Sequence, residues 1–208
     1  MQFAKYVACG ISLLAMACQA PAEDHSPGGE ELYQLCSNCH GETGAGRPVL
    51  NAPAIAGLGS WYIEAQLKKF RSGERGTHPE DLPGMGMRPM AMSLQNDAQI
   101  ADIAAHVAAM PATRPKPILD GDAAKGAGIY ATCSTCHGKS GEGEQEKSAP
   151  ALNKTHDWYL VRQLQNFKSR VRGGNPADAT GAQMLPWVAM LADEQAMKDV
   201  VAHIQTLK

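Results

Sequence analysis

The chain lacks a marked excess of charge of one sign. Its 208 residues include 19 Lys and Arg and 21 Asp and Glu, so the formal net charge is only -2. A protein that binds nucleic acid neutralises phosphates with a strongly basic surface, and this composition therefore argues against a nucleic-acid partner. A hydrophobic content of 44% beside balanced charge is typical of a globular protein.

Long apolar runs are also missing. The only marked run, residues 6–17, is shorter than a membrane span requires, and it predicts an export signal over residues 1–22. Cleavage after Ala22 would release a secretory peptide. Cleavage after Ala17 would leave Cys18 as the first residue, attached to the membrane through lipid. Both alternatives place the protein in the periplasm without a transmembrane helix in the mature chain.

Cysteine for structural disulfides is absent as well. Of the six cysteines, Cys9 and Cys18 belong to the signal region. The other four form two matching motifs, "CSNCH" at residues 36–40 and "CSTCH" at residues 133–137. None is left to form a disulfide bond.

The two motifs belong to an internal repeat with an offset of 97 residues (133 minus 36). No insertion is needed from about Gly29 to the end of the chain. We therefore expect a first domain over residues 23–110, a stiff proline-rich linker over residues 111–119 and a second domain over residues 120–208. Other aligned pairs are Trp61 with Trp158, Tyr62 with Tyr159, Gln66 with Gln163, Phe70 with Phe167, Arg75 with Arg172 and Met87 with Met184.

Helical patterns dominate both copies, and β-strand signals are almost absent. One helix is predicted to run into each cysteine motif. A second is predicted to begin at Ser60 or Asp157, and a third closes each copy. The third pair has apolar residues at helical spacing: Ile100, Ile103, Val107 and Met110, and Met197, Val200, Ile204 and Leu207. The predicted fold class is all-α, with two tandem domains related by the repeat.

Each motif places two thiols and an imidazole on one helical turn, where residues three and four apart share a face. A zinc site would need a fourth ligand, and a redox Cys-x-x-Cys pair needs no histidine. In an exported protein C-x-x-C-H is the attachment signature of haem c, with the histidine as proximal iron ligand. We expect two covalently attached haem c groups, held by Cys36, Cys39 and His40 and by Cys133, Cys136 and His137.

The distal iron ligands are predicted from the repeat. Met87 and Met184 alone share the offset, both in the pattern M-x-P-x-x-x-x-L. Met90, also predicted to lie in a loop, stays open as the alternative in the first copy, although its counterpart Trp187 cannot ligate iron. Met92, Met190 and Met197 are predicted to be packing residues. A second alternative, ligation by His106 and His203, is disfavoured because both histidines lie within the closing helices.

Further residues are predicted around each haem. The carbonyls of Pro53 and Pro150 are expected to accept a hydrogen bond from the proximal histidines. The glycines after each histidine are expected to let the backbone pass close to the haem edge. Trp61, Tyr62, Trp158 and Tyr159 are candidates to donate to haem propionates, and Arg75 and Arg172 to neutralise them; the alternatives are core packing for the aromatics and a solvated face for the arginines.

The two C-x-x-C-H motifs, the "APA" segments that follow them, the M-x-P segments and the alanine-rich last helices resemble dihaem class I cytochromes c of the cytochrome c4 type. The resemblance covers nearly the whole mature chain. It implies two small helical domains related by a pseudo-twofold axis, with haems close enough to exchange electrons. It also implies an electron shuttle between a quinol-oxidising complex and a terminal oxidase. His106 and His203 depart from the pattern, which often has tyrosine there.

The function that we expect is one-electron transfer, from a quinol-oxidising complex or dehydrogenase to a terminal oxidase or reductase. Two alternatives stay open. A haem enzyme such as a dihaem peroxidase would need an open distal position, against which the matching Met87 and Met184 argue. A dedicated electron-accepting subunit of an oxidising enzyme would use the same haems with one fixed partner.

Overall fold

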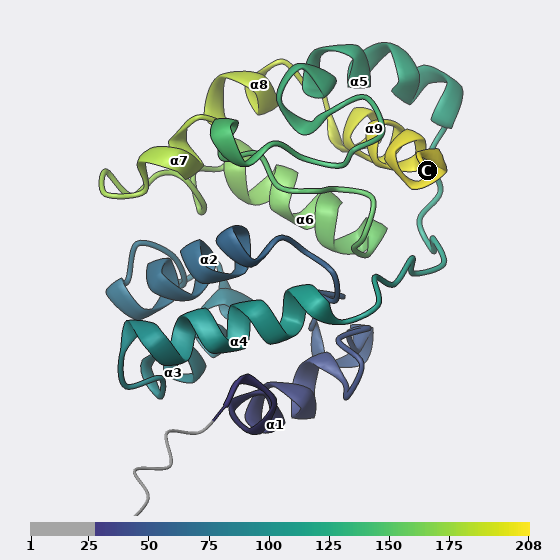
Figure 1. The fold of residues 1–208 in the computed structure, drawn as a ribbon. Coiled ribbons are helices and arrows are strands. Elements are labelled where there is room, and N and C mark those ends of the chain that lie inside the picture. Colours follow the sequence, from purple (N-terminus) through teal and green to yellow (C-terminus); the bar gives the residue numbers. More distant parts are fainter. Residues whose placement is uncertain (1–27) are drawn as a thin grey trace, which may run out of the picture.

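The computed structural model describes residues 28–208, and it is all-helical over that range (Figure 1). The predicted export signal and Cys18 lie outside the described residues. The first half contains α1 (Gly29–His40), the 3-10 helix η1 (Pro48–Leu50), α2 (Ser60–Ser72), α3 (Leu82–Met92) and α4 (Asp97–Ala109). The second half contains α5 (Ala123–His137), η2 (Gln145–Lys147), α6 (Asp157–Lys168), α7 (Ala179–Ala182), α8 (Leu185–Ala189) and α9 (Glu194–Thr206). The predicted all-α class is confirmed.

The methionine-rich segment of the first half is helical, which corrects the expectation that Met87 and Met90 lie in a loop. The Asp81 side chain caps α3 by accepting from the Gly84 amide at 3.1 Å. Pro83 stands in the first turn of α3, where a missing amide proton removes no helical hydrogen bond. In the second half the same region is split into α7 and α8, and Met184 lies at the turn between them.

The first and last helices of each half cross at a glycine. A Cβ atom on Gly29 would lie 2.2 Å from the carbonyl oxygen of Asp102, and one on Gly126 would lie 1.9 Å from that of Asp199. Only glycine allows backbones to approach so closely. The crossing fixes where α1 and α5 end, and therefore where the C-x-x-C-H motifs lie.

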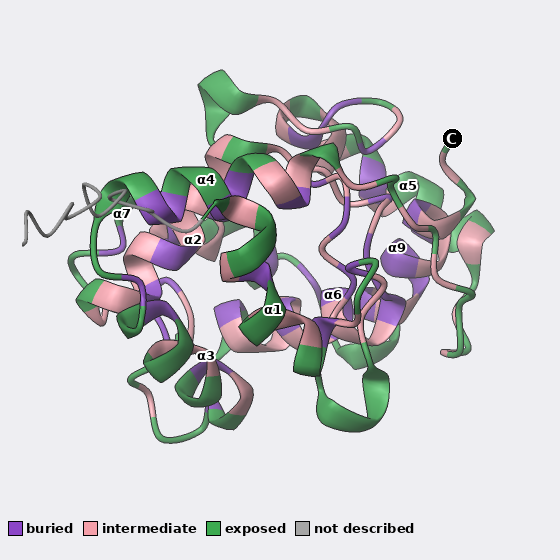
Figure 2. Ribbon diagram, turned by 60° about the horizontal axis from the view of Figure 1, so that its bottom comes forward, coloured by how far each residue is buried: buried purple, intermediate pink, exposed green. Residues whose placement is uncertain are grey.

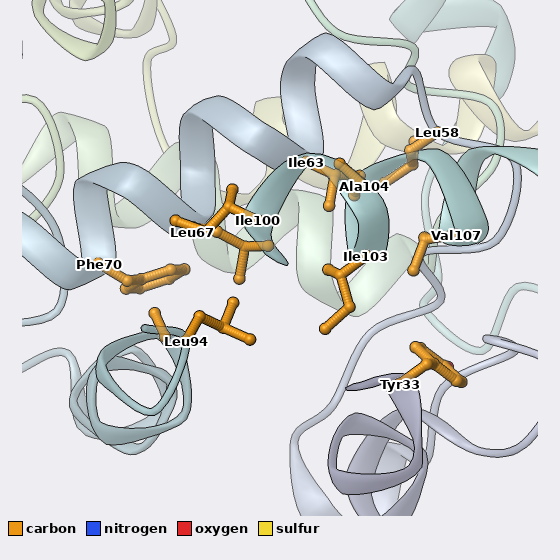
Figure 3. Packing of buried hydrophobic residues seen from close by; sticks show 11 residues of the cluster. Tyr33, Leu58, Ile63, Leu67, Phe70, Leu94, Ile100, Ile103, Ala104 and Val107 are labelled. Carbon is orange, nitrogen blue, oxygen red and sulfur yellow. The ribbon is translucent and has the colours of Figure 1, made fainter. Parts of the chain in front are cut away.

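Each half has its own hydrophobic core beneath these helices. In the first, Ile100, Ile103 and Val107 of α4 are at most 2% exposed, and Figure 3 shows them among residues of α1 and α2. In the second, Val200 and Ile204 of α9 occupy the matching positions. Figure 2 shows buried and exposed residues alternating along the long helices, as expected when one face of each lies on a core.

The two halves lie against each other with α2 facing α6, joined by a connector between α4 and α5 that contains no helix (Figure 1). Arg114 of this connector donates to the carbonyl oxygen of Leu207 at 2.7 Å, which ties it to the end of α9. Over residues 28–208, every helix is too short or too polar to span a bilayer.

Candidate haem sites

One large apolar cavity of about 990 Å³ is lined by residues of both halves. The predicted haem-binding residues at its wall are Cys36, Cys39, His40, Met87, Cys133, His137 and Met184. Cys136 is the one predicted attachment residue that does not line it. Both cysteine motifs therefore adjoin a single space that crosses the interface.

The two histidines at the ends of α1 and α5 have the same hydrogen bond. His40 Nδ1 lies 2.9 Å from the carbonyl oxygen of Pro53, and His137 Nδ1 lies 2.9 Å from that of Pro150. A carbonyl oxygen can only accept, so Nδ1 carries the proton in both rings. Burial lowers the pKa of both histidines, and the hydrogen bonds only partly oppose this effect. Each ring is therefore neutral, with the lone pair of Nε2 free for a metal ion.

The loop after each histidine requires glycine where it meets the proline segment. Gly46 has φ of +82°, and a Cβ atom there would lie 2.5 Å from the Pro53 carbonyl carbon and from the Ala54 amide nitrogen. Gly143 meets the equivalent atoms at 2.6 and 2.5 Å. These two glycines let the proline segment approach the histidine.

The methionines of α3 divide between two faces. Met87 and Met90, three residues apart, both line the large cavity, whereas Met85 and Met92 line a small pocket beside Arg88. Met87 also packs on the first core, and Met90 is 37% exposed. The cavity wall therefore holds the same two methionines, Met87 and Met90, that the sequence leaves as candidates for the first distal ligand.

The predicted packing role holds for only one of three methionines. Met197 is 3% exposed and belongs to the second core, as expected. Met92 and Met190 are 52% and 65% exposed, so the prediction that they are packing residues is wrong. Met92 lies near the end of α3, and Met190 follows α8 at the cavity wall beyond Met184.

A reciprocal hydrogen-bond network joins the halves at the cavity wall. Arg75 donates to Gln66 of its own half at 2.9 Å, and to Tyr159 and Gln163 of the other half at 3.1 and 3.0 Å. Arg172 donates to Gln163 of its own half at 2.9 Å, and to Tyr62 and Gln66 of the other at 3.3 and 3.1 Å. These pairs are related by the 97-residue repeat, so the interface has pseudo-twofold symmetry.

The charge of this network is unbalanced. Among residues 28–208, neither Arg75 nor Arg172 forms an ion pair with a carboxylate, and the buried Nε atom of each has no hydrogen-bond partner. Burial by itself raises the pKa of Tyr62, but the two guanidinium groups outweigh it and hold that pKa below its ordinary value. Two buried guanidinium groups without an ion-pair partner, at the wall of an apolar cavity, fit the anionic propionates of a haem.

Two other groups of predicted residues do not reach the cavity. Trp61 and Trp158 are absent from its wall, and Trp158 lies between the His156 ring and Arg162. His106 and His203 are absent from it too. Their rings contact Tyr33 and Tyr130 with centroids 5.3 and 5.4 Å apart, which excludes them as distal ligands.

Sequence reasoning missed three polar features of the interface. Gln66 and Gln163 were aligned in the repeat but given no role, although a matched polar pair was a usable signal. His156 has no counterpart histidine, and its contact with Ala54 depends on tertiary structure. The buried ion pair of Lys69 with Asp178 also lacks a repeat counterpart.

Comparison with known proteins agrees with this geometry. The cytochrome c family model matches residues 28–111 and again residues 123–208. The chain is 29% identical over 192 residues to the thiosulfate dehydrogenase electron acceptor of Stutzerimonas stutzeri strain A1501, covering 83% of each chain. Other relatives bear the name cytochrome c4.

Two solved structures share the fold. The cytochrome c4 of Acidithiobacillus ferrooxidans superposes with a TM-score of 0.66 at 27% identity, over 84% of this chain and 99% of that one. The thiosulfate dehydrogenase TsdBA of Marichromatium purpuratum gives a TM-score of 0.69 at 29% identity over 86% of this chain, but this chain spans only 40% of the TsdBA chain. The protein is therefore a dihaem electron carrier, and it belongs to the cytochrome c family, with two tandem domains of the cytochrome c4 type.

Proposed function

We propose that this chain carries single electrons in the periplasm from a quinol-oxidising complex or a dehydrogenase to a terminal oxidase or reductase. His40 and Met87 hold the iron of the first haem, and His137 and Met184 that of the second. The thioether bonds come from the cysteines of each motif. The export signal proposed for residues 1–22 delivers the chain, and the intact mass of the exported protein distinguishes lipid on Cys18 from cleavage after Ala22.

The observation that carries this proposal is the shared cavity. Equivalent residues of both halves line one apolar space, so the two haem sites adjoin across the interface. Haem supplies a one-electron couple when bound. The chain's residues supply neutral imidazoles fixed by the proline carbonyls, soft thioether donors, and apolar walls that exclude water and thereby raise the reduction potential. Arg75 and Arg172 supply the positive charge for the propionates.

A spectroelectrochemical titration of the purified holoprotein, with and without carbon monoxide, tests the proposal. We expect two high-potential one-electron steps, low-spin spectra throughout and no response to carbon monoxide. A high-spin haem that binds carbon monoxide would show an open iron and would contradict the carrier function.

A second candidate is a dedicated electron acceptor of a sulfur-compound oxidising enzyme. Two relatives, at 29% and 31% identity, are named thiosulfate dehydrogenase electron acceptor. Mixing the oxidised protein with a purified thiosulfate dehydrogenase and thiosulfate tests this candidate. Reduction much faster than that of an unrelated monohaem cytochrome c, together with co-elution of the two proteins, would favour the dedicated acceptor. Equal rates without co-elution would favour the free shuttle.

A further inference from the structure

The peptide unit between Pro53 and Ala54 is hydrogen-bonded on both sides. Its carbonyl oxygen accepts from His40 Nδ1 at 2.9 Å. Its N–H group donates to His156 Nδ1 of the second domain at 3.0 Å. One amide therefore links the proximal histidine of the first haem site to a histidine that lies 102 residues away from Ala54 along the chain.

The imidazole of His156 is held firmly as an acceptor. It is 8% exposed, and its ring lies against that of Trp158 with centroids 5.4 Å apart. The preceding residue, Thr155, donates to the carbonyl oxygen of Ala54 at 2.9 Å and so fixes the same segment. Because an amide N–H can only donate, Nδ1 of His156 is unprotonated in this arrangement.

We propose that His156 is a positioning residue that tunes the first haem site from the second domain. The inference rests on the proposed function, in which His40 is an iron ligand. An amide that donates through its N–H becomes a better acceptor at its oxygen, because hydrogen bonds in a chain polarise one another. The Pro53 carbonyl then accepts a stronger hydrogen bond from Nδ1 of His40, so the imidazole becomes a more basic ligand. A more basic ligand favours the oxidised iron.

Within residues 28–208 the second haem site lacks this contact, so it serves as an internal reference. His137 forms the same hydrogen bond to Pro150 at 2.9 Å. The repeat counterpart of His156 is Gly59, however, which has no side chain to accept a hydrogen bond. The acceptor therefore acts on one site alone. It lowers the reduction potential of the first haem relative to the second and helps to set which haem is reduced first.

The test uses the full holoprotein with His156→Leu, which removes the acceptor, and His156→Asn, whose side-chain oxygen replaces Nδ1. Lys154→Met is the matched control, since it removes a 2.7 Å contact to Gly57 from the same loop without touching the 53–54 peptide. The measurements are the two midpoint potentials and the proton NMR of the oxidised protein, with the second haem assigned through Met184→Ala.

In His156→Leu we expect the reduction equilibrium of the first haem to shift about three- to tenfold toward the reduced form, tenfold being about 59 mV for one electron. The second haem should stay unchanged, and His156→Asn and Lys154→Met should keep both parent potentials. Equal shifts of both haems, or a shift below twofold in His156→Leu while the parent remains low-spin and six-coordinate, would overturn the inference and leave the carrier function intact. Binding of carbon monoxide by the parent protein would instead overturn the function on which it rests.

Discussion

Arg75 of the first domain donates a hydrogen bond of 3.1 Å to the hydroxyl of Tyr159 in the second domain. Arg172 makes the reciprocal contact with Tyr62 at 3.3 Å. Both guanidinium groups also lie over a phenylalanine ring of their own domain, 4.6 Å from the centroids of Phe70 and Phe167. Each arginine is thus fixed by contacts in its own domain and donates hydrogen bonds to the other domain. These reciprocal contacts hold the two haem sites in a defined relative position.

Replacing Arg75 by Leu should lower the free energy of unfolding by about 2–3 kcal/mol, because charge-assisted hydrogen bonds to three side chains are lost in a buried position. Denaturant unfolding of the holoprotein measures this. Arg71→Leu is the control, since Arg71 pairs with Asp97, which is 63% exposed, and should cost less than about 1 kcal/mol. Similar losses in the two variants would show that the interface network contributes little.

Replacing Met184 by Ala should abolish the methionine-to-iron charge-transfer band of one haem and lower its potential, because a soft thioether donor is removed. In the first domain, Met87→Ala should do the same and Met90→Ala should not. Absorption spectra of the oxidised protein check all three variants. Loss of the band in Met90→Ala with retention in Met87→Ala would reverse the assignment within α3.

Replacing Lys69 by Met should lower the free energy of unfolding by about 3 kcal/mol or more. The carboxylate of Asp178, which is 1% exposed, would lose its only ion-pair partner among residues 28–208. Lys68→Met is the matched control. Its partners Glu64 and Asp97 are 36% and 63% exposed, so this substitution should lower the free energy of unfolding by less than about 1 kcal/mol. Adding Asp178→Asn to Lys69→Met should recover part of the loss. Failure to recover any would mean that the charge of Asp178 is not the cause.

Replacing Gly46 by Ala should be more disruptive than replacing Gly41 by Ala. Both glycines have positive φ, of +82° and +78°, so each substitution carries a backbone strain of about 1–3 kcal/mol. At Gly41 a Cβ atom meets nothing within 4 Å, whereas at Gly46 it would displace the Pro53–Ala54 peptide. Gly46→Ala should therefore also shift the first haem's potential. Equal unfolding free energies and unchanged potentials in both variants would contradict this.

Acid pH should destabilise the fold through His156. Burial lowers its folded-state pKa, and the nearby carboxylate of Asp157 opposes but does not reverse that shift. As the pH falls below about 6.5, the unfolded chain therefore binds the proton before the folded chain does. The contribution of His156 to the free energy of unfolding is fully present above that pH. It is lost as the pH falls toward the lowered pKa, by at most about 1.4 kcal/mol per pH unit. Unfolding of the holoprotein between pH 7.5 and 5 measures the slope. His156→Asn should remove this component, and an unchanged slope would assign it to other groups.

Sequence reasoning located both histidines with their proline carbonyls, since residues thirteen apart in a repeat could be compared directly. It failed for α3, where a loop was expected, because Pro83 stands in the first helical turn and the Asp81 side chain caps the helix. It left two roles open for Trp61 and Trp158, because an aromatic residue near a motif carries no information about which way its ring faces.

The sequence by itself determined the two domains, their all-helical class and the two haem attachment motifs, because these depend on local periodicity and on ligands close together in the chain. Tertiary structure alone decided what lies between the domains. Arg75 meets Tyr159, Lys69 meets Asp178 and His156 meets Ala54 across separations of 84 to 109 residues. Such contacts depend on how two folded surfaces dock, and no local pattern in either copy encodes that geometry.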